Sequence, residues 1–341
     1  MKLQWIIDPL SVAMNQRFCC IPYPFKIPKL GYCFSGLNWL TRSKSNIFNI
    51  MKIVCLLAIY LSSYYGFAQT LSDHESLEVV TWNLQWFGHH HPDTRQDKGP
   101  KDEELQVNNA LKVIEAMGKP DLILFQEITS DNFFRQLAQR SGYRYFLSPG
   151  GEGKQRIGLF HNDQVTSIGE PQQILVNKKK QFAQRPPVLA KFSHSSVSEF
   201  YVIGFHLKAH WPPAPQNEKI KSWKRRKKAA ELTKEYLEQH LEGEKVIVLG
   251  DWNDDVDVSN LKGYETPFKN FLPDPTVRFV TKYLSFSNNK SSKHGSVIDH
   301  VLITDDLFSD FVGTGVFNAL DMKLDYHKTI SDHYPVFVVF E

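Results

Sequence analysis

The stretch Val246–Asp255, VIVLGDWNDD, constrains the fold of this chain more than any other. Four apolar residues run directly into a glycine, which is typical of a buried strand that ends there. Asp251 and Asn253 follow at positions i and i+2, so both side chains leave the strand end on one face. A carboxylate beside a carboxamide suits a site that activates water and holds a phosphate. A polar turn after a core strand gives the same pattern.

The first 68 residues differ in composition from the rest of the 341-residue chain. They contain all four cysteines, seven Lys or Arg and one acidic residue, which leaves 33 of the 40 basic and 36 of the 37 acidic side chains in 69–341. Because this remainder has a net charge of −3, overall charge is no argument for nucleic-acid binding. Since it lacks cysteine, it can form neither a disulfide nor a thiolate metal site.

Residues 51–68 have the pattern of a secretory signal peptide. Lys52 precedes the apolar run Ile53–Leu61, and Gly66-Phe67-Ala68 is a small-x-small cleavage signature. The apolar run is too short to span a bilayer. We therefore expect cleavage near Ala68 and a secreted or periplasmic protein whose mature chain has no membrane span. We also expect translation to start at Met51, with 1–50 as an upstream extension or a disordered tail.

The region 69–341 predicts a single α/β domain, because apolar strands alternate with amphipathic helices. Helices are predicted at 104–117, from Ser130 or Asp131 to near Gly142, and from an Asn217 cap to about Leu241. Strands are predicted at 78–82, 121–125, 156–160, 188–192, 199–206, 297–303 and 335–340.

Polar side chains suited to metal or phosphate chemistry stand at the ends of these strands. In chain order they are Asn83, Glu127, His206, Asp251, Asn253, Asp299, Asp332 and His333. Singly, each has a plain structural explanation as a cap, a turn residue or a strand-end histidine. Together they supply oxygen ligands that suit Mg²⁺ or Mn²⁺, and two histidines for acid–base chemistry near neutral pH. Such a set fits the hydrolysis of a phosphodiester.

Seven motifs across 79–340 carry a resemblance to a known family. They are VVTWNLQWFG (79–88), DLILFQEI (121–128), RPPVLAKF (185–192), EFYVIGFH (199–206), GDWND (250–254), VIDHV (297–301) and SDHYPV (331–336). In this order they resemble the endonuclease/exonuclease/phosphatase family, and within it the secreted deoxyribonucleases of the pancreatic type. The resemblance implies a four-layer α/β sandwich, with two mixed β-sheets packed face to face and helices outside. It also implies a Mg²⁺-dependent hydrolase in which Mn²⁺ can substitute and Ca²⁺ can serve as a structural ion.

The resemblance further implies a role for each residue of the set. Glu127 would be the principal metal ligand, with Asn83 and Asp332 near the cation. His206 and His333 would be the acid–base histidines, and Asp299 would orient His333. Asp251 and Asn253 would position the nucleophile and the phosphate.

Substrate-binding residues are expected beside this set: Arg185, Gln155, Arg156, Arg225 and Arg226. Arg185 matches an arginine that contacts a backbone phosphate in the resembling enzymes. Gln155 replaces the glutamate that pairs with their first catalytic histidine, so it would orient His206 without stabilising a charged ring.

The residues that read the DNA minor groove do not carry over. The positions of the corresponding arginine and tyrosine are taken by Thr129 and by Glu152 or Gly153. The helix start at 219–228 offers seven basic residues, which predict a phosphate-binding ridge unless they only solvate the helix.

These patterns predict a secreted endonuclease that hydrolyses DNA or RNA by in-line attack of an activated water. It would act as a monomer without a stable protein partner. The alternative is the same catalytic core acting on a phospholipid, a sphingomyelin headgroup or an inositol phosphate. A non-catalytic binding protein on this fold is a further alternative, but the complete set from Asn83 to His333 argues against it.

Overall fold

The computed structural model describes residues 4–6, 76–88, 100, 102–150, 154–209, 213–288 and 296–341. Residues 51–68, with the predicted signal peptide, and most of 1–50 lie outside these ranges, so the expectations for 1–68 stay predictions. Within 1–50 the strand β1 (Gln4–Ile6) is described, and it pairs antiparallel with β13 (Phe311–Val316). No helix among the described residues combines the length and apolar character needed to cross a bilayer.

The first sheet has the strand order β1-β13-β14-β2-β3-β5-β4. At its centre β2 (Leu77–Phe87) runs parallel to β3 (Leu122–Ile128) and antiparallel to β14 (Val336–Phe340). The strands β5 (Arg156–His161) and β4 (Arg144–Leu147) complete one side as an antiparallel pair.

The second sheet has the order β11-β12-β10-β9-β8-β6, with the short strand β7 (Gln172–Gln173) also paired to β8. Its central strands β9 (Ser198–His206) and β10 (Val246–Asp251) are parallel to one another. The flanking strands are antiparallel to their neighbours: β8 (Val188–His194), β6 (Thr166–Ser167), β12 (Asp299–Thr304) and β11 (Val277–Phe279).

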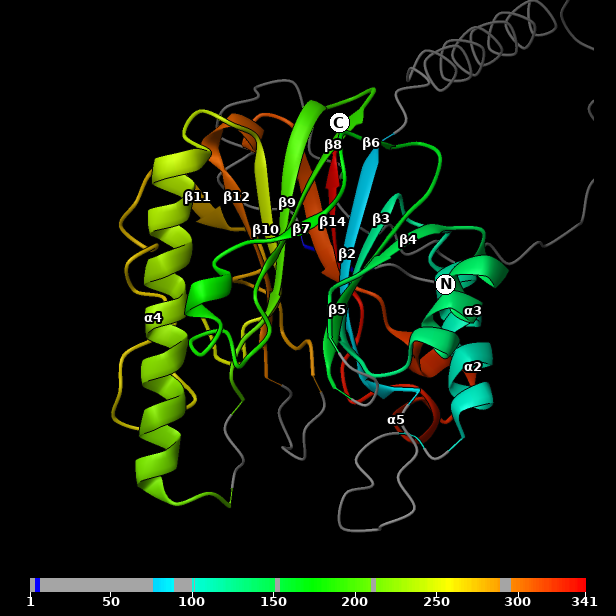
Figure 1. Cartoon of the computed structure of the whole chain (residues 1–341), viewed down its shortest axis with the longest axis horizontal. Helices are drawn as coiled ribbons and strands as arrows, with labels where there is room; N and C mark the ends of the chain where they lie inside the picture. Colours follow the sequence, from blue (N-terminus) through cyan, green and yellow to red (C-terminus); the bar gives the residue numbers. More distant parts are fainter. Residues whose placement is uncertain are drawn as a thin grey trace, which may run out of the picture. The chain divides into compact units, whose positions relative to one another are not determined.

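Helices lie outside the two sheets, as Figure 1 shows. On the side of the first sheet lie α2 (Glu103–Ala116), α3 (Asp131–Ser141) and the short α5 (Tyr326–Thr329). The long α4 (Gln216–His240) covers the second sheet. Single 3₁₀ turns occupy Val176–Lys178, Asp305–Leu307 and Ala319–Met322. This is the two-sheet α/β sandwich that the resemblance implied.

Two large apolar cores fill the layers. One lies between the sheets and under α4, and the other lies between the first sheet and α2 with α3. The sheets approach closely where a Cβ on Gly204 of β9 would lie 2.3 Å from a methyl carbon of Leu124 in β3. At Gly250, the penultimate residue of β10, φ is +146° and a Cβ would lie 2.0 Å from the carbonyl oxygen of Phe205. This position therefore accepts only glycine.

The strands and helices predicted for 76–341 are present, with ends that shift by a few residues. One cap is wrong: α4 begins at Gln216 after Pro215, and Asn217 lies inside the first turn. The strand predicted at 297–303 begins at Asp299. Both errors shift the end of an element by one or two residues and leave its buried residues unchanged.

Candidate active site

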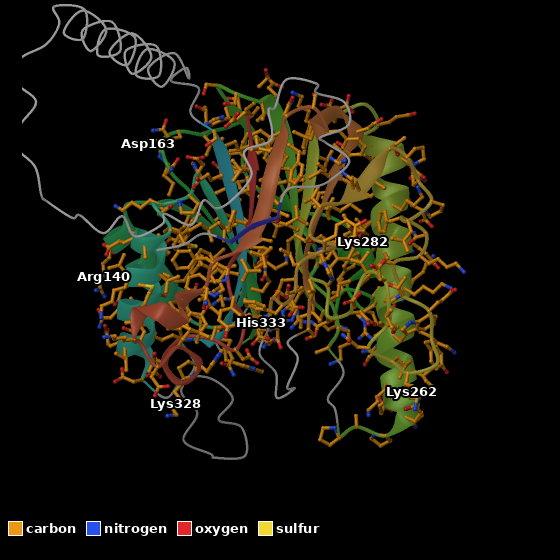
Figure 2. All side chains as sticks on the ribbon, turned by 180° about the vertical axis from the view of Figure 1, so that it is seen from behind. Arg140, Asp163, Lys262, Lys282, Lys328 and His333 are labelled. Carbon is orange, nitrogen blue, oxygen red and sulfur yellow. The ribbon has the colours of Figure 1, made fainter. Side chains whose placement is uncertain are left out.

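The strand-end residues of the two sheets meet at one edge of the sandwich. Because β9 and β10 are parallel, their last residues, His206 and Asp251, are direct neighbours. Asp251 also faces Asp299, the first residue of the antiparallel strand β12. His333 precedes β14, which brings it to the same edge from the first sheet. In Figure 2 His333 lies low in the sandwich, between the side that carries Lys328 and the side that carries Lys262.

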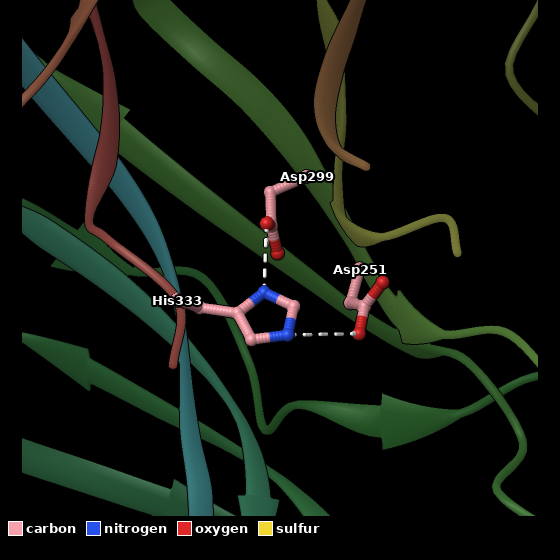
Figure 3. Close-up of side chains that lie close together, drawn as sticks. All are labelled: Asp251, Asp299 and His333. Carbon is pink, nitrogen blue, oxygen red and sulfur yellow. Dashed lines mark hydrogen bonds and ion pairs between the residues drawn. The ribbon is translucent and has the colours of Figure 1, made fainter. Parts of the chain in front are cut away.

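His333 is held by carboxylates on both ring nitrogens (Figure 3). Its Nδ1 lies 2.8 Å from Oδ2 of Asp299, and its Nε2 lies 4.0 Å from Oδ2 of Asp251. The Ser287 hydroxyl donates to the same Asp299 oxygen at 2.8 Å. The sequence-based expectation that Asp299 orients His333 agrees with this contact.

The electrostatics of His333 favour its charged form. Burial of the ring acts to lower its pKa, but the carboxylates of Asp299, Asp332 and Asp251 outweigh burial and raise the pKa to about 9. Asp332 contributes from 3.9 Å, measured from its Oδ1 to Nε2 of His333. The raised pKa therefore favours the imidazolium form of His333 at neutral pH.

The side chain of Asn83 contacts the carboxylates of Asp251 and Glu127. Its Nδ2 donates to Oδ2 of Asp251 at 3.0 Å and lies 3.3 Å from Oε1 of Glu127. Oε2 of Glu127 accepts from the backbone N–H of Trp86 at 3.0 Å. His206 completes the group, with its Nε2 3.4 Å from Asp251 and 3.8 Å from Glu127. These four side chains come from the four parallel strands of the two sheets.

Left-handed backbone conformations occur at two of the predicted site residues. Glu127 has φ 64° and Asn253 has φ 56°, values that non-glycine residues adopt only at an energetic cost. Asn253 is held there because its own N–H donates to Oδ1 of Asp251 at 2.9 Å and its Nδ2 donates to the Leu207 carbonyl at 3.1 Å. Strain of this kind, fixed by hydrogen bonds, is typical of preorganised sites.

Arg185 reaches the same edge from the segment before β8. Its guanidinium donates to Gln155 and to the carbonyls of His206 and Leu207, at 3.4 and 3.3 Å for the last two. Burial lowers the pKa of Arg185, and the charges of Glu127 and Asp251 oppose that shift. Gln155 accepts a hydrogen bond from Arg185, so the structure gives it a partner other than the predicted His206.

The remaining predicted substrate-binding residues behave differently from one another. Arg156 is buried and forms an ion pair with Asp131 at the start of α3. Arg225 is partly exposed, as expected for the basic ridge. Arg226 contradicts the ridge prediction, because it is fully buried and pairs with Asp254 at 2.8 Å. The helix turns its side chain inward, onto the face that also buries Trp223 and Ala230.

The sequence analysis missed three residues of the site. Asn288 places its Nδ2 2.9 Å from Nε2 of His333, and Ser287 shares Asp299 with that ring. Ser331 donates to the Asn83 carbonyl at 2.6 Å and accepts the N–H of His333 at 3.0 Å. It therefore links the backbone of Asn83 to that of His333. Only Ser331 gave a signal, as the first residue of SDHYPV. The segment before Asp299 has no periodicity that points to Ser287 or Asn288.

The donor atoms of the site fit a divalent cation with oxygen ligands. The carboxylates of Glu127 and Asp251 both contact the side-chain NH₂ group of Asn83, and their combined negative charge favours a cation at this place. Asp251, Asp299 and His333 also bring one ligand atom each within 4.8 Å of one another. Of these, Nδ1 of His333 is occupied by Asp299. Oδ1 of Asp299 is buried with no hydrogen-bond partner among the described residues. Asn83 fits less well as a ligand, since its Oδ1 accepts the N–H of Gln85.

A family model confirms the resemblance at the level of the family. Residues 80–333 match the model described as the endonuclease/exonuclease/phosphatase family. The chain therefore belongs to this family, whose members are hydrolases of the nuclease and phosphatase type and are generally dependent on divalent metals. A comparison with curated protein sequences gives no significant match.

Solved structures share the fold at low sequence identity. The TDP2 of D. rerio, solved with a single-strand DNA product, aligns with a TM-score of 0.56 and 16% identity over 78% of this chain and 99% of its own. An AP endonuclease from Archaeoglobus fulgidus gives 0.55 and 16% over 78% and 99%. A family member from Bacteroides vulgatus gives 0.57 and 14% over 78% and 99%. At these identities the similarity establishes the fold alone.

Proposed function

We propose that the protein is a secreted, Mg²⁺-dependent phosphodiesterase that cleaves DNA or RNA as an endonuclease. The observation that carries this proposal is the pairing of a histidine ring with two carboxylates at one edge of the sandwich. Nδ1 of His333 is anchored by Asp299, and its Nε2 lies 4.0 Å from Oδ2 of Asp251. A donor and an acceptor on one small site are what the attack of water on a phosphodiester requires.

Each side chain of the site has its own role in the proposed hydrolysis. Asp251 takes the proton of the attacking water, while His206 and Asn83 keep its carboxylate oriented. His333 donates its Nε2 proton to the leaving oxygen as the bond between that oxygen and phosphorus breaks, while the water oxygen forms the new bond to phosphorus. Glu127 and Asp332 would hold Mg²⁺, which supplies positive charge to the phosphate when bound. Mn²⁺ would occupy the same ligands.

Nucleic acid is the substrate that the surrounding surface favours. Lys219, Lys224 and Arg225 form no ion pair within the described part of the chain, so the start of α4 keeps free positive charge. Such charge tracks the phosphates of a strand beyond the scissile one. The TDP2 of D. rerio, with the same fold, was solved with a single-strand DNA product.

One observation keeps the alternative substrate class open. Thr129, at the position of the expected groove-reading arginine, is buried and donates to the Phe87 carbonyl at 2.7 Å. It cannot reach a DNA duplex. A phospholipid, sphingomyelin or inositol phosphate would need no such contact, so these substrates form the second candidate class.

Secretion belongs to the proposal because residues 51–68 have the composition of a signal peptide. The test is mass spectrometry of the N-terminus of protein made by its natural host. A start near Gln69 supports export to the periplasm or the medium. Peptides from 1–50 in the mature protein would contradict both export and the start at Met51.

The decisive activity test gives the full chain three substrates: supercoiled plasmid, single-stranded RNA and a choline phospholipid. Each is incubated with Mg²⁺ and, separately, with a chelator, and His333→Ala serves as the matched control. Metal-dependent nicking of plasmid or cleavage of RNA supports the nuclease. Release of phosphocholine with both nucleic acids intact overturns it in favour of the lipid class. No hydrolysis of any substrate overturns the phosphodiesterase itself.

A further inference from the structure

Arg226 is a buried cation at the junction of three segments. It projects from the inner face of α4, and none of its surface is exposed. Its Nε and Nη2 donate to Oδ2 of Asp254 at 3.2 and 2.8 Å, and its Nη1 donates to the carbonyl of Lys208 at 2.7 Å. One guanidinium thus binds both the loop after β10 and the turn after β9.

Each of these two segments carries a residue of the active site. Lys208 follows His206 by two residues, and Asp254 follows Asp251 by three. The two turns are also joined directly: the N–H of Leu207 donates to the Asp251 carbonyl at 2.8 Å, and Asn253 donates to the Leu207 carbonyl at 3.1 Å. Arg226, on α4, adds a third link between the two turns, because its guanidinium binds Lys208 in one and Asp254 in the other.

Asp254 is itself held by several hydrogen bonds within the loop after β10. Its Oδ2 also accepts from the Ser259 hydroxyl at 3.1 Å, and its Oδ1 accepts the backbone N–H groups of Asp255 and Asn260, at 3.1 and 2.5 Å. Its carbonyl oxygen lies 3.1 Å from Nε2 of His300. A carboxylate with this many donors is fixed in position, so the guanidinium bound to it is fixed as well.

Burying the charge of Arg226 costs free energy, so its burial calls for a compensating structural role. Burial lowers the pKa of Arg226, and the charge of Asp254 opposes that shift. Buried ion pairs add little to stability compared with well-packed apolar residues, but they fix geometry wherever all their partners are satisfied. The planar fork of arginine holds the carboxylate of Asp254 through two donors and the Lys208 carbonyl through a third, a fixed planar geometry that the ammonium group of lysine does not provide.

We propose that Arg226 is a positioning residue of the active site: it sets the separation of His206 and Asp251 by clamping the turns that follow β9 and β10. The inference rests on the proposed function. It replaces the role as a phosphate ligand that the charge run in the sequence suggested. The affected distance is the 3.4 Å between Nε2 of His206 and Oδ2 of Asp251.

The test uses Arg226→Gln, with Lys245→Met as the matched control. Lys245 precedes β10 at the end of the strand remote from Asp251, and it too binds a carboxylate and a carbonyl: Asp310 at 2.7 Å and Val197 at 3.0 Å. Both variants lose a buried or half-buried cation. Only Arg226 touches the turns beside the site, so only Arg226→Gln should change the chemistry.

We expect Arg226→Gln to lower kcat about 10- to 100-fold while KM stays near the wild-type value, since a small misplacement of catalytic groups has effects of this size. Lys245→Met should lower the melting temperature and keep kcat. Arg226→Lys keeps the charge and serves if the glutamine variant fails to fold, and it should lose kcat as well. Equal kcat values for Arg226→Lys and Lys245→Met would overturn the proposal.

Two further readouts separate this proposal from others. A rise in KM with a weaker salt dependence and an unchanged kcat would return Arg226 to the role of a phosphate ligand and overturn the positioning role. A crystal structure of the variant needs no activity: a longer distance between His206 and Asp251 supports the clamp, and an unchanged distance contradicts it. A wild-type protein without hydrolase activity would contradict the proposed function alone.

Discussion

Asn288 lies against the functional nitrogen of His333, with its Nδ2 2.9 Å from Nε2. A carboxamide can donate to a neutral imidazole or, after a half-turn, accept from an imidazolium. It is therefore suited to hold a ring whose proton state changes during a reaction. Asp299 fixes the other nitrogen, so the ring is held from both sides.

Replacing Asn288 with alanine should lower kcat about 10- to 100-fold, the usual effect of losing a partner that orients a functional side chain. KM should change less, since Asn288 acts through His333. Steady-state kinetics on the substrate that the wild type cleaves will measure both. Asn162→Ala is the matched control, because Asn162 donates to Asp121 at 3.0 Å among loops outside the site. Equal kcat values for the two variants would exclude a role for Asn288.

The replacement His333→Ala should lower the rate by several powers of ten, as should Asp251→Ala, because each removes a group that acts on the reacting atoms. Asp299→Asn should have a smaller effect, since the amide keeps the ring in place and loses only the charge that favours the imidazolium. Single-turnover rates give this ranking. A mild effect of His333→Ala or Asp251→Ala would contradict the assignment of the site.

The sequence was sufficient to place the polar residues that follow apolar strands and that the structure brings together. Asp251 and His206 each end a run of buried residues, and such runs are visible without any tertiary information. Their meeting was not visible, since it depends on β9 and β10 being parallel neighbours. That arrangement came from the resemblance of the seven motifs to a known family.

Arg226 shows why a charge run was misinterpreted. Counting seven basic residues at 219–228 ignores the phase of the helix. Arg226 lies three residues after Trp223 and four before Ala230, so these three side chains share one face of the helix, and the apolar character of Trp223 and Ala230 predicts that this face is buried. Asn288 had no such signal, because its loop reaches His333 only through the tertiary fold.

A chelator should abolish the activity, and Mg²⁺ should restore it, because the carboxylates of Glu127, Asp251 and Asp332 at this edge would repel a phosphate unless a cation offsets their charge. Glu127→Gln should raise the Mg²⁺ concentration needed for half-maximal rate about 10-fold or more, since a carboxylate ligand becomes neutral. Titration of the rate with Mg²⁺ will measure this shift. An unchanged metal requirement in Glu127→Gln would remove Glu127 from the ligands.

The stability of the protein should fall at mildly acidic pH because of His300. Burial lowers the pKa of this ring, which is enclosed by Thr281 and the Asp254 carbonyl. The unfolded chain binds a proton near the ordinary histidine pKa of about 6.5, so the contribution is complete above that pH and is lost as the pH falls toward the lowered pKa.

This pH dependence can be isolated with His300→Gln, whose free energy of unfolding should vary less between pH 7.5 and 5.5 than that of the wild type. Urea titrations at several pH values measure the difference. His240→Gln, at the exposed end of α4, is the control and should follow the wild type. Parallel curves for His300→Gln and the wild type would show that the ring does not titrate below its ordinary range.

The contact between the two sheets gives a last prediction, which concerns packing rather than chemistry. A methyl group on Gly204 would lie 2.3, 2.7 and 3.0 Å from three carbon atoms of Leu124, which is itself buried. Gly204→Ala should therefore destabilise the fold by about 1–3 kcal/mol, the usual cost of overpacking a core. In a Leu124→Ala background the same substitution should cost less, because the side chain that it meets has been removed. Urea denaturation of the four proteins of this cycle measures the coupling. Additive effects would mean that the sheets separate at this point without resistance, and that their spacing is set elsewhere.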